Sequence, residues 1–276
     1  MKVAITGRGL VTPLGIGLAE NEQALRSGRP GIVFMPEWRE RGLESQVAGV
    51  ANENPPTSLL DQKNIRFTTP NARMAVAAAE QALQEARLSL AEIRGRRIAV
   101  ILGSAGSTHT QIYEGGKVIA DSGKSKRLTP FMVPRVMASS AVANLSLILG
   151  VTGESYDISS ACASGAHAIM VACRLITSGV YDLVITGGTE EVNWLLAAGF
   201  DAMRALSRGY NDRPEQASRP FDRDRDGFVI AAGAGILVLE HPDHARARGV
   251  IPSAYVTGAA ANSNAADMVV PQAESS

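Results

Sequence analysis

The sequence predicts an α/β protein with a largely parallel sheet covered by helices on both faces. Short runs rich in Val, Ile and Leu alternate with segments of helical length along the 276 residues. Several of these short runs are apolar throughout, which is typical of strands buried on both faces of a parallel sheet. Three of the helical segments are followed by a glycine, the residue that most readily adopts the left-handed conformation after a helix.

In the first part of the chain, residues 3–6 (VAIT) predict a short strand, and the glycine-rich segment after them predicts a turn at Gly7. A helix at 18–27 follows and ends before a glycine. The helix at 69–87 has the clearest start, because a threonine that can act as N-cap precedes a proline at the first helical position. Residues 97–102 (RIAVIL) predict a buried strand.

In the second part, a helix at 134–149 ends before a glycine, and residues 156–159 predict the next strand. A helix at 163–178 also ends before a glycine and leads to a strand at 182–186. Residues 228–239 predict a long strand that contains two glycines.

The remaining segments bear on the domain organisation. The polar, aperiodic segment 204–226 predicts a long excursion between two core elements, and loops of this length are usually functional or specially packed. Residues 251–261 predict a new strand with no further strand after it. We therefore expect an N-terminal half at 1–250, and the first strand and loop of a second half at 251–276, interrupted at the C-terminus.

The composition argues against several classes of protein. The 27 basic residues balance the 27 acidic residues, so the summed charge does not favour nucleic acid or an anionic membrane. The N-terminus lacks the apolar region of a signal peptide, and no apolar run is long enough to span a membrane. A cytoplasmic protein is expected, with two reduced cysteines rather than a disulfide.

Motifs that suggest a cofactor or a metal fail on their spacing. The glycines after the first strand lack the third glycine of a dinucleotide turn, and the glycines at 103 and 106 lack the lysine of a phosphate loop. His241 and His244 have no further ligands nearby in the sequence, so a solvated helix start is expected there. The alternating aspartates at 222–226 lack the glycine and glutamate of a calcium loop. No cofactor and no metal are expected.

One cysteine lies where a nucleophile is expected. Cys162 comes after the strand at 156–159 and before the helix at 163–178, and its neighbours are small. Small neighbours allow the tight turn of a nucleophile elbow, which leaves the sulfur accessible. The helix N-terminus favours the thiolate, and its unpaired N–H groups could receive an oxyanion from an attacked carbonyl.

Cys173 provides an internal comparison. It lies eleven residues later, in the middle of the same expected helix and among apolar residues. The rise of a helix places the two cysteines roughly 16 Å apart along the axis, which is too far for a disulfide. Cys173 is therefore expected to be a small core residue.

The segment around Cys162, YDISSACASGAH at 156–167, resembles the active-site segment of the β-ketoacyl-acyl-carrier-protein synthases. Further blocks occur in the order and spacing of this family along the whole chain: VAITG at 3–7, GGTEE at 187–191, FDAMRALS at 200–207, ASRPFD at 217–222, RDGFV at 225–229 and ADMVVP at 266–271. Several of these blocks resemble the type I synthase most, with the type II synthase close behind.

The resemblance implies a thiolase-like fold in α-β-α-β-α layers, usually paired as a homodimer. It also implies an acyltransferase of fatty acid synthesis that needs no metal or redox cofactor. Cys162 would take an acyl chain from an acyl carrier protein by transthioesterification. A carbanion formed from malonyl carrier protein would then attack the acyl-Cys162 carbonyl.

The family also carries two histidines, a lysine and a glycine-rich Phe loop in its second half, which drive decarboxylation and complete the oxyanion hole. None of these is matched in the chain. Its four histidines, none of which lies in the family's histidine motifs, are His109, His167, His241 and His244. We therefore expect the chain to carry the nucleophile without the histidine pair, either as a fragment or as a truncated and inactive product.

By the same resemblance, Phe200 would line the acyl pocket and Met132 would line the pocket of the partner subunit. Both residues are equally compatible with a plain core position. The basic residues that would meet the acidic carrier protein are Lys63, Arg66, Lys126 and Arg127. A local patch on a neutral protein suits transient docking, and a solvated basic face is the alternative.

Other interpretations stay open at this point. A type II synthase fits nearly as well as type I. A thiolase or a type III synthase acting on coenzyme A esters is disfavoured by the blocks at 217–222 and 225–229. A non-catalytic partner subunit of the chain-length-factor kind is disfavoured by the presence of Cys162. A truncated chain without function is the last alternative.

Overall fold

The computed structural model describes residues 2–94, 96–106 and 108–263, and its centre is a mixed β-sheet. In chain order the strands are β1 (Val3–Thr12), β2 (Gly15–Ile16), β3 (Ile32–Phe34), β4 (Val47–Gly49), β5 (Ala99–Gly103), β6 (Ser155–Ile158), β7 (Leu183–Glu190), β8 (Gly233–Glu240) and β9 (Ala254–Val256). The main sheet has the order β2-β1-β8-β7-β5-β6, with β9 also paired to β1. A second sheet consists of β3 and β4.

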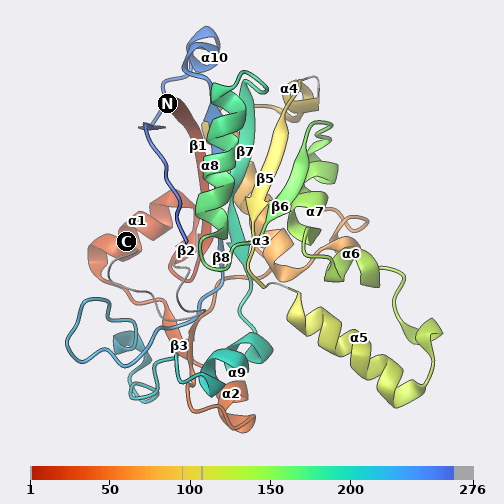
Figure 1. The fold of residues 1–276 in the computed structure, drawn as a ribbon, viewed down its shortest axis with the longest axis vertical. Helices are drawn as coiled ribbons and strands as arrows, with labels where there is room; N and C mark the ends of the chain where they lie inside the picture. The colour runs from red at the N-terminus through yellow and green to blue at the C-terminus, as the bar shows by residue number, and fades with distance from the viewer. Residues whose placement is uncertain (1, 95, 107, 264–276) are drawn as a thin grey trace.

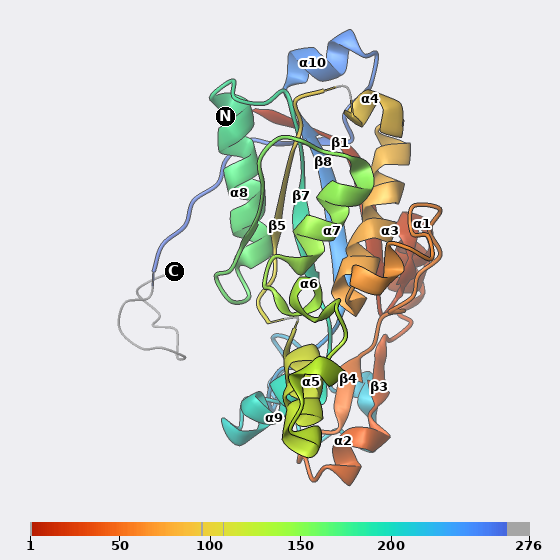
Figure 2. The same ribbon diagram turned by 90° about the vertical axis from the view of Figure 1, so that its right-hand side faces the viewer.

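Helices cover both faces of the main sheet. In chain order the α-helices are α1 (Gly17–Ser27), α2 (Pro36–Glu40), α3 (Pro70–Glu85), α4 (Leu90–Arg94), α5 (His109–Ser122), α6 (Met132–Val136), α7 (Ser140–Leu149), α8 (Ser164–Thr177), α9 (Trp194–Ala202) and α10 (Pro242–Ala247). Short 3-10 helices are η1 (Ile65–Phe67), η2 (Ser125–Arg127) and η3 (Pro214–Gln216). Helix α8 lies on one face of the sheet, and α3 and α7 lie on the other (Figures 1 and 2).

The predicted α/β class is confirmed, but the sheet is mixed rather than largely parallel. Strand β5 runs parallel to β6 and β7, whereas β8 runs antiparallel to both β7 and β1. The chain leaves β7 at its carboxyl end, passes through α9 and the long polar segment at 204–226, and enters β8 from that same end (Figure 1). Because no crossover helix returns the chain to the other end of the sheet, β8 has to run antiparallel.

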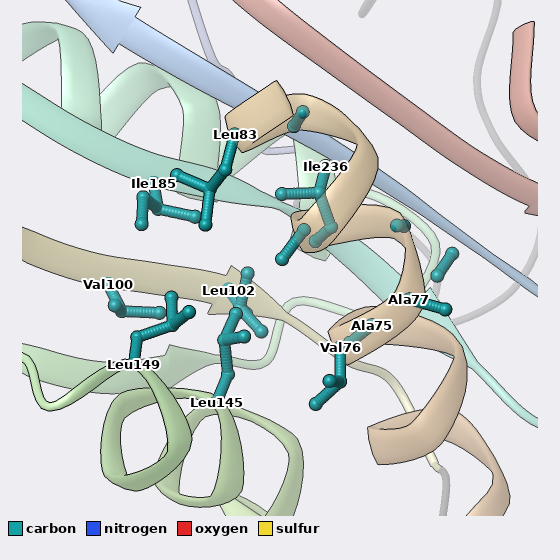
Figure 3. Packing of buried hydrophobic residues seen from close by; sticks show 14 of the residues in the cluster. Ala75, Val76, Ala77, Leu83, Val100, Leu102, Leu145, Leu149, Ile185 and Ile236 are labelled. Atoms are coloured by element: carbon teal, nitrogen blue, oxygen red, sulfur yellow. The ribbon is translucent and has the colours of Figure 1, made fainter. Parts of the chain in front are cut away.

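Each face of the sheet carries its own apolar core. On one face, Leu83 of α3 and Leu145 of α7 pack with Leu102 and Ile185 of the sheet (Figure 3). On the other face, α8 buries Ala168, Ala172, Cys173 and Ile176 against the sheet. The apolar character of β5 and β7 follows from this arrangement, because both of their faces are covered.

The expected turn at Gly7 is wrong, because β1 continues through Gly7 and Gly9 to Thr12. A Cβ added at Gly7 would lie 2.0 Å from the carbonyl oxygen of Ala82, and one added at Gly9 would lie 1.8 Å from that of Ala78. The two glycines therefore allow the backbone of α3 to approach β1 closely. The small side chains of the alanines in α3 allow the same close approach from the side of the helix.

Several element boundaries also differ from the sequence-based expectation. The helices expected at 18–27, 69–87 and 163–178 are confirmed as α1, α3 and α8. The single helix expected at 134–149 is two helices, α6 and α7, because Met137 adopts an extended conformation between them. The long strand expected at 228–239 begins only at Gly233.

Of the strand expected at 251–261, only Ala254–Val256 forms strand β9. This strand extends the main sheet by pairing with Val3–Ile5 of β1. The ADMVVP block at 266–271, and with it half of the unit expected at 251–276, lies outside the described residues.

His244 is not at a solvated helix start, because it belongs to a buried ion network at the end of β8. The carboxylate of Glu240 accepts hydrogen bonds from Thr6 Oγ1 at 2.6 Å and Arg248 Nη2 at 3.0 Å, and lies 2.6 Å from His244 Nδ1. Burial alone raises the pKa of Glu240, but the contacts with Arg248, Thr6 and His244 outweigh it and lower the pKa. Across the described ranges, no group of three or more His, Cys, Asp or Glu side chains could hold a metal ion.

The close contact between β1 and α3 predicts that Gly9→Ala destabilises the fold by about 3 kcal/mol, because the new Cβ would overlap the helix backbone and force the two elements apart. Urea unfolding followed by circular dichroism measures this loss. The control is Gly116→Ala, at an exposed position inside α5 where an added Cβ has open space. That change should stabilise the chain by about 0.5–1 kcal/mol. Equal effects of the two substitutions would contradict the proposed role of Gly9.

Candidate active site

Cys162 lies in a tight turn between β6 and α8, as the sequence predicted. Strand β6 ends at Ile158, α8 begins at Ser164, and the Cys162 side chain is exposed. Ala161 adopts a φ of +50°, a left-handed conformation that is costly for a residue with a Cβ. The turn therefore resembles the strained strand-to-helix elbow that presents a nucleophile in other enzymes.

The start of α8 rests directly on the backbones of two neighbouring strands. Gly103 at the end of β5 pairs with Gly188 of β7. A Cβ at Gly103 would lie 2.3 Å from the carbonyl carbon of Ser164, and one at Gly188 would lie 3.2 Å from the Cα of Gly165. Glycine at these positions lets the first turn of α8 sit against the sheet, which fixes where the elbow projects.

Sequence reasoning did not assign this role to Gly103, Gly165 and Gly188. The available signal was glycine inside or at the end of an apolar strand, which often marks the close approach of another backbone. That signal does not say which segment approaches.

Cys173 belongs to α8 and is fully buried on the side of this helix that faces the sheet, as expected, and burial raises the pKa of its thiol. It is enclosed by the apolar cluster on that face of the sheet. Solvent therefore reaches the thiol of Cys162, in the turn before α8, but not the thiol of Cys173 within α8. A solvent-borne thiol reagent or acyl donor can reach Cys162 without any opening of the fold.

The structure places Phe200 and Met132 in separate surroundings. Phe200 of α9 makes an edge-to-face contact with Phe228, with ring centroids 5.1 Å apart, and is partly buried. Met132 of α6 packs against Gly115 of α5 and lines a cavity of about 240 Å³. Neither Cys162 nor Phe200 lines that cavity, so the described chain does not bring the three residues into one pocket.

The four basic residues expected to form a docking patch are exposed and lie in two short segments. Lys63 and Arg66 lie at or just before η1, and Lys126 and Arg127 lie in η2. Phe67, the last residue of η1, makes an edge-to-face contact with Phe131, which directly precedes α6, and the ring centroids are 4.9 Å apart. The two pairs of cations are about sixty residues apart in the chain.

Two carboxyl groups with raised pKa lie near the carboxyl ends of β6 and β7, the partly buried Asp157 and the buried Glu191, and sequence reasoning missed them. Burial and the nearby charge of Glu190 raise the pKa of Asp157 to about 7. Burial, together with the charges of Glu53 and Glu190, raises the pKa of Glu191 to about 8. One carboxyl oxygen of each residue has no hydrogen-bond partner among the described residues. Both carboxyl groups therefore hold a proton more readily than an exposed carboxyl group does.

Helices on both faces of the mixed sheet (Figure 2) and an exposed cysteine in a strand-to-helix elbow fit the ketosynthases, a class of acyltransferases. The sequence matches the family model of the beta-ketoacyl synthase N-terminal domain over residues 1–245, and the chain belongs to this family. It is 41% identical over 275 residues to 3-oxoacyl-[acyl-carrier-protein] synthase 1 of Escherichia coli strain K12. That alignment covers 99% of this chain and 67% of the relative.

Solved structures agree with this assignment. The crystal structure of a beta-ketoacyl synthase from Burkholderia phymatum STM815 matches with a TM-score of 0.92 and 35% identity, over 99% of this chain and 67% of that chain. A ketosynthase bound to the hexaketide, in complex with its type II PKS acyl-carrier protein, matches with a TM-score of 0.81 and 30% identity, over 93% of this chain and 62% of that one. The family and the fold expected from the motifs are confirmed.

The raised pKa of Glu191 predicts that the stability of the chain falls as the pH rises from about 4.5 to about 8. In this window the folded state retains a proton that the unfolded state has released, so unfolding becomes easier with each step in pH. Glu191→Gln should remove up to about 4 kcal/mol of this pH dependence. Urea unfolding at pH 5, 6.5 and 8 measures it. The exposed Glu215→Gln is the control, and a wild-type slope in Glu191→Gln would refute the assignment.

Proposed function

We propose that this chain supplies the acyl-accepting nucleophile, Cys162, of a type I 3-oxoacyl-[acyl-carrier-protein] synthase. The observation that carries the proposal is the exposed thiol in the elbow between β6 and α8, within a chain that matches synthases of this type. Residues 1–250 would form the N-terminal half of that enzyme. A cytoplasmic location and a homodimer are part of the same proposal.

In the loading step, the Cys162 thiolate attacks the thioester carbonyl of an acyl carrier protein. A C–S bond forms to Cys162, the C–S bond to the carrier breaks, and the carrier leaves as a thiolate that takes up the proton lost by Cys162. Thioester exchanges for thioester, so the step costs little free energy and the acyl group stays activated. The N–H groups of Ala163 and Ser164, at the start of α8, already donate to the carbonyl oxygens of Ser160 and Ala161, so these two donors are not open to the negative oxygen of the intermediate.

In the condensation step, malonyl carrier protein loses carbon dioxide, and the resulting carbanion attacks the acyl-Cys162 carbonyl. A carbon–carbon bond forms, the C–S bond to Cys162 breaks, and the thiolate is regenerated. The chain spans 67% of the length of its Escherichia coli relative. The family's histidine pair has no counterpart among the four histidines of the chain. The proposal for this chain therefore centres on loading.

The exposed cations of η1 and η2 support docking of an acidic carrier protein. Lys63 and Arg66 on one segment, and Lys126 and Arg127 on the other, would pair with its acidic side chains. The aromatic contact of Phe67 with Phe131 links η1 to the start of α6, four residues beyond Arg127. Phe200 would line the acyl pocket, and Met132 would contribute to the pocket of the partner subunit.

The proposal predicts that a long-chain alkyl chloromethyl ketone modifies Cys162 and spares Cys173, because only the first thiol is exposed. Peptide mass spectrometry of the labelled native chain identifies the site. Cys162→Ala should abolish labelling, whereas Cys173→Ala should leave it unchanged. Labelling of Cys173 alone in the wild-type chain would overturn the proposed nucleophile.

The proposed docking patch predicts that reversing one of its charges weakens the binding of an acyl carrier protein. Lys63→Glu and Lys126→Glu should each lower the affinity about three- to fivefold at low salt, since an exposed ion pair contributes up to about 1 kcal/mol. Titration calorimetry with acyl carrier protein measures the change. Arg246→Glu in α10, at the other end of the sheet from α6 (Figure 1), is the control. An equal loss in that variant would argue against a local patch.

A further inference from the structure

We propose that His167 and Ser160 form a positioning pair that holds the Cys162 elbow against the start of α8. The proposal rests on the proposed function of Cys162 as the nucleophile. Ser160 precedes Cys162 by two residues, and His167 follows it by five, one turn into α8. The hydroxyl oxygen of Ser160 lies 2.6 Å from Nδ1 of His167, so this contact spans the elbow.

Ser160 is held a second time through its backbone. Its N–H donates to Oγ of Ser164 at 2.9 Å, and that hydroxyl donates to the carbonyl oxygen of Ala161 at 2.6 Å. The side chain of Ser160 is therefore tied to His167 while its main chain is tied to Ser164. Both partners belong to α8, so both contacts fasten the residues before Cys162 to the helix that follows it.

The fastening opposes the strain stored at Ala161. Its φ of +50° lies in the left-handed region, which is unfavourable for a residue other than glycine. A loop that is free to move would relax this torsion. The two hydrogen bonds to α8 oppose that relaxation.

The contact between Ser160 and His167 can form in either protonation state of the imidazole. When the ring is neutral, the Ser160 hydroxyl can donate to Nδ1; when the ring is charged, Nδ1–H can donate to the hydroxyl oxygen. The hydroxyl rotates to suit both cases. The contact at Nδ1 therefore assigns His167 to holding the elbow.

Loss of the pair would let the elbow relax and leave the Cys162 sulfur without a fixed orientation. A sulfur that is not held in one orientation should react about two- to fivefold more slowly with an acyl analogue, the change expected for the loss of one hydrogen bond. The rate of Cys173 modification in the same sample separates this effect from unfolding, because Cys173 is buried in the folded chain.

The experiment measures the rate at which a long-chain alkyl chloromethyl ketone modifies Cys162 at a single pH, followed by peptide mass spectrometry. Ser160→Ala and His167→Phe should lower this rate by about two- to fivefold. His167→Asn should restore part of it, because the Asn amide can take the place of Nδ1. The control is Ser159→Ala, at an exposed serine that takes no part in the described hydrogen bonds, and its rate should equal that of the wild type.

The outcomes separate this proposal from the proposed function. An unchanged rate of Cys162 modification in Ser160→Ala and His167→Phe, with Cys173 still protected, overturns the positioning role. An equal fall in Ser159→Ala overturns it as well. If His167→Phe exposes Cys173 through unfolding, Ser160→Ala takes its place in the test. A Cys162 modification rate that is unchanged in Ser160→Ala then overturns the positioning role. A wild-type chain in which the acyl analogue does not label Cys162 overturns the proposed nucleophile instead.

Discussion

The close approach of α8 to the backbones of β5 and β7 is the constraint on which the candidate site depends. Gly103 and Gly188 are paired at the ends of neighbouring strands, and neither leaves room for a Cβ beside the first turn of the helix without a shift. The same principle joins β1 to α3 through Gly7 and Gly9. Small residues thus set the distance between helix and sheet on both faces, and this distance decides where Cys162 projects.

The site also depends on the different surroundings of similar groups. Cys162 is exposed and Cys173 is buried, so one thiol is reachable and the other contributes to the core. Glu191 is buried with too few partners and retains a proton to about pH 8, whereas Glu240 is buried with three hydrogen-bonding side chains and ionises readily. In each comparison the residue types are the same, and burial and hydrogen-bonding partners set the chemistry.

Local signals predicted the helices better than the sheet. The Thr-Pro start of α3 and the glycines after α1 and α8 are short-range features, and the structure confirms these helices. The direction of β8 was missed because it depends on which end of the sheet the segment 204–226 reaches. The turn expected at Gly7 was wrong for a similar reason. Glycine is required there because the backbone of α3, about seventy-five residues away in the chain, packs directly against it.

By itself the sequence determined the α/β class, the family and the cysteine in an elbow between strand and helix. These depend on contiguous motifs and on residue types within one or two turns of each other. Only the tertiary structure decided that Phe67 of η1 contacts Phe131 before α6, that Met132 and Phe200 lie in different surroundings, and that His167 reaches back to Ser160. Such contacts depend on how the backbone folds between the residues, and no local pattern records that path.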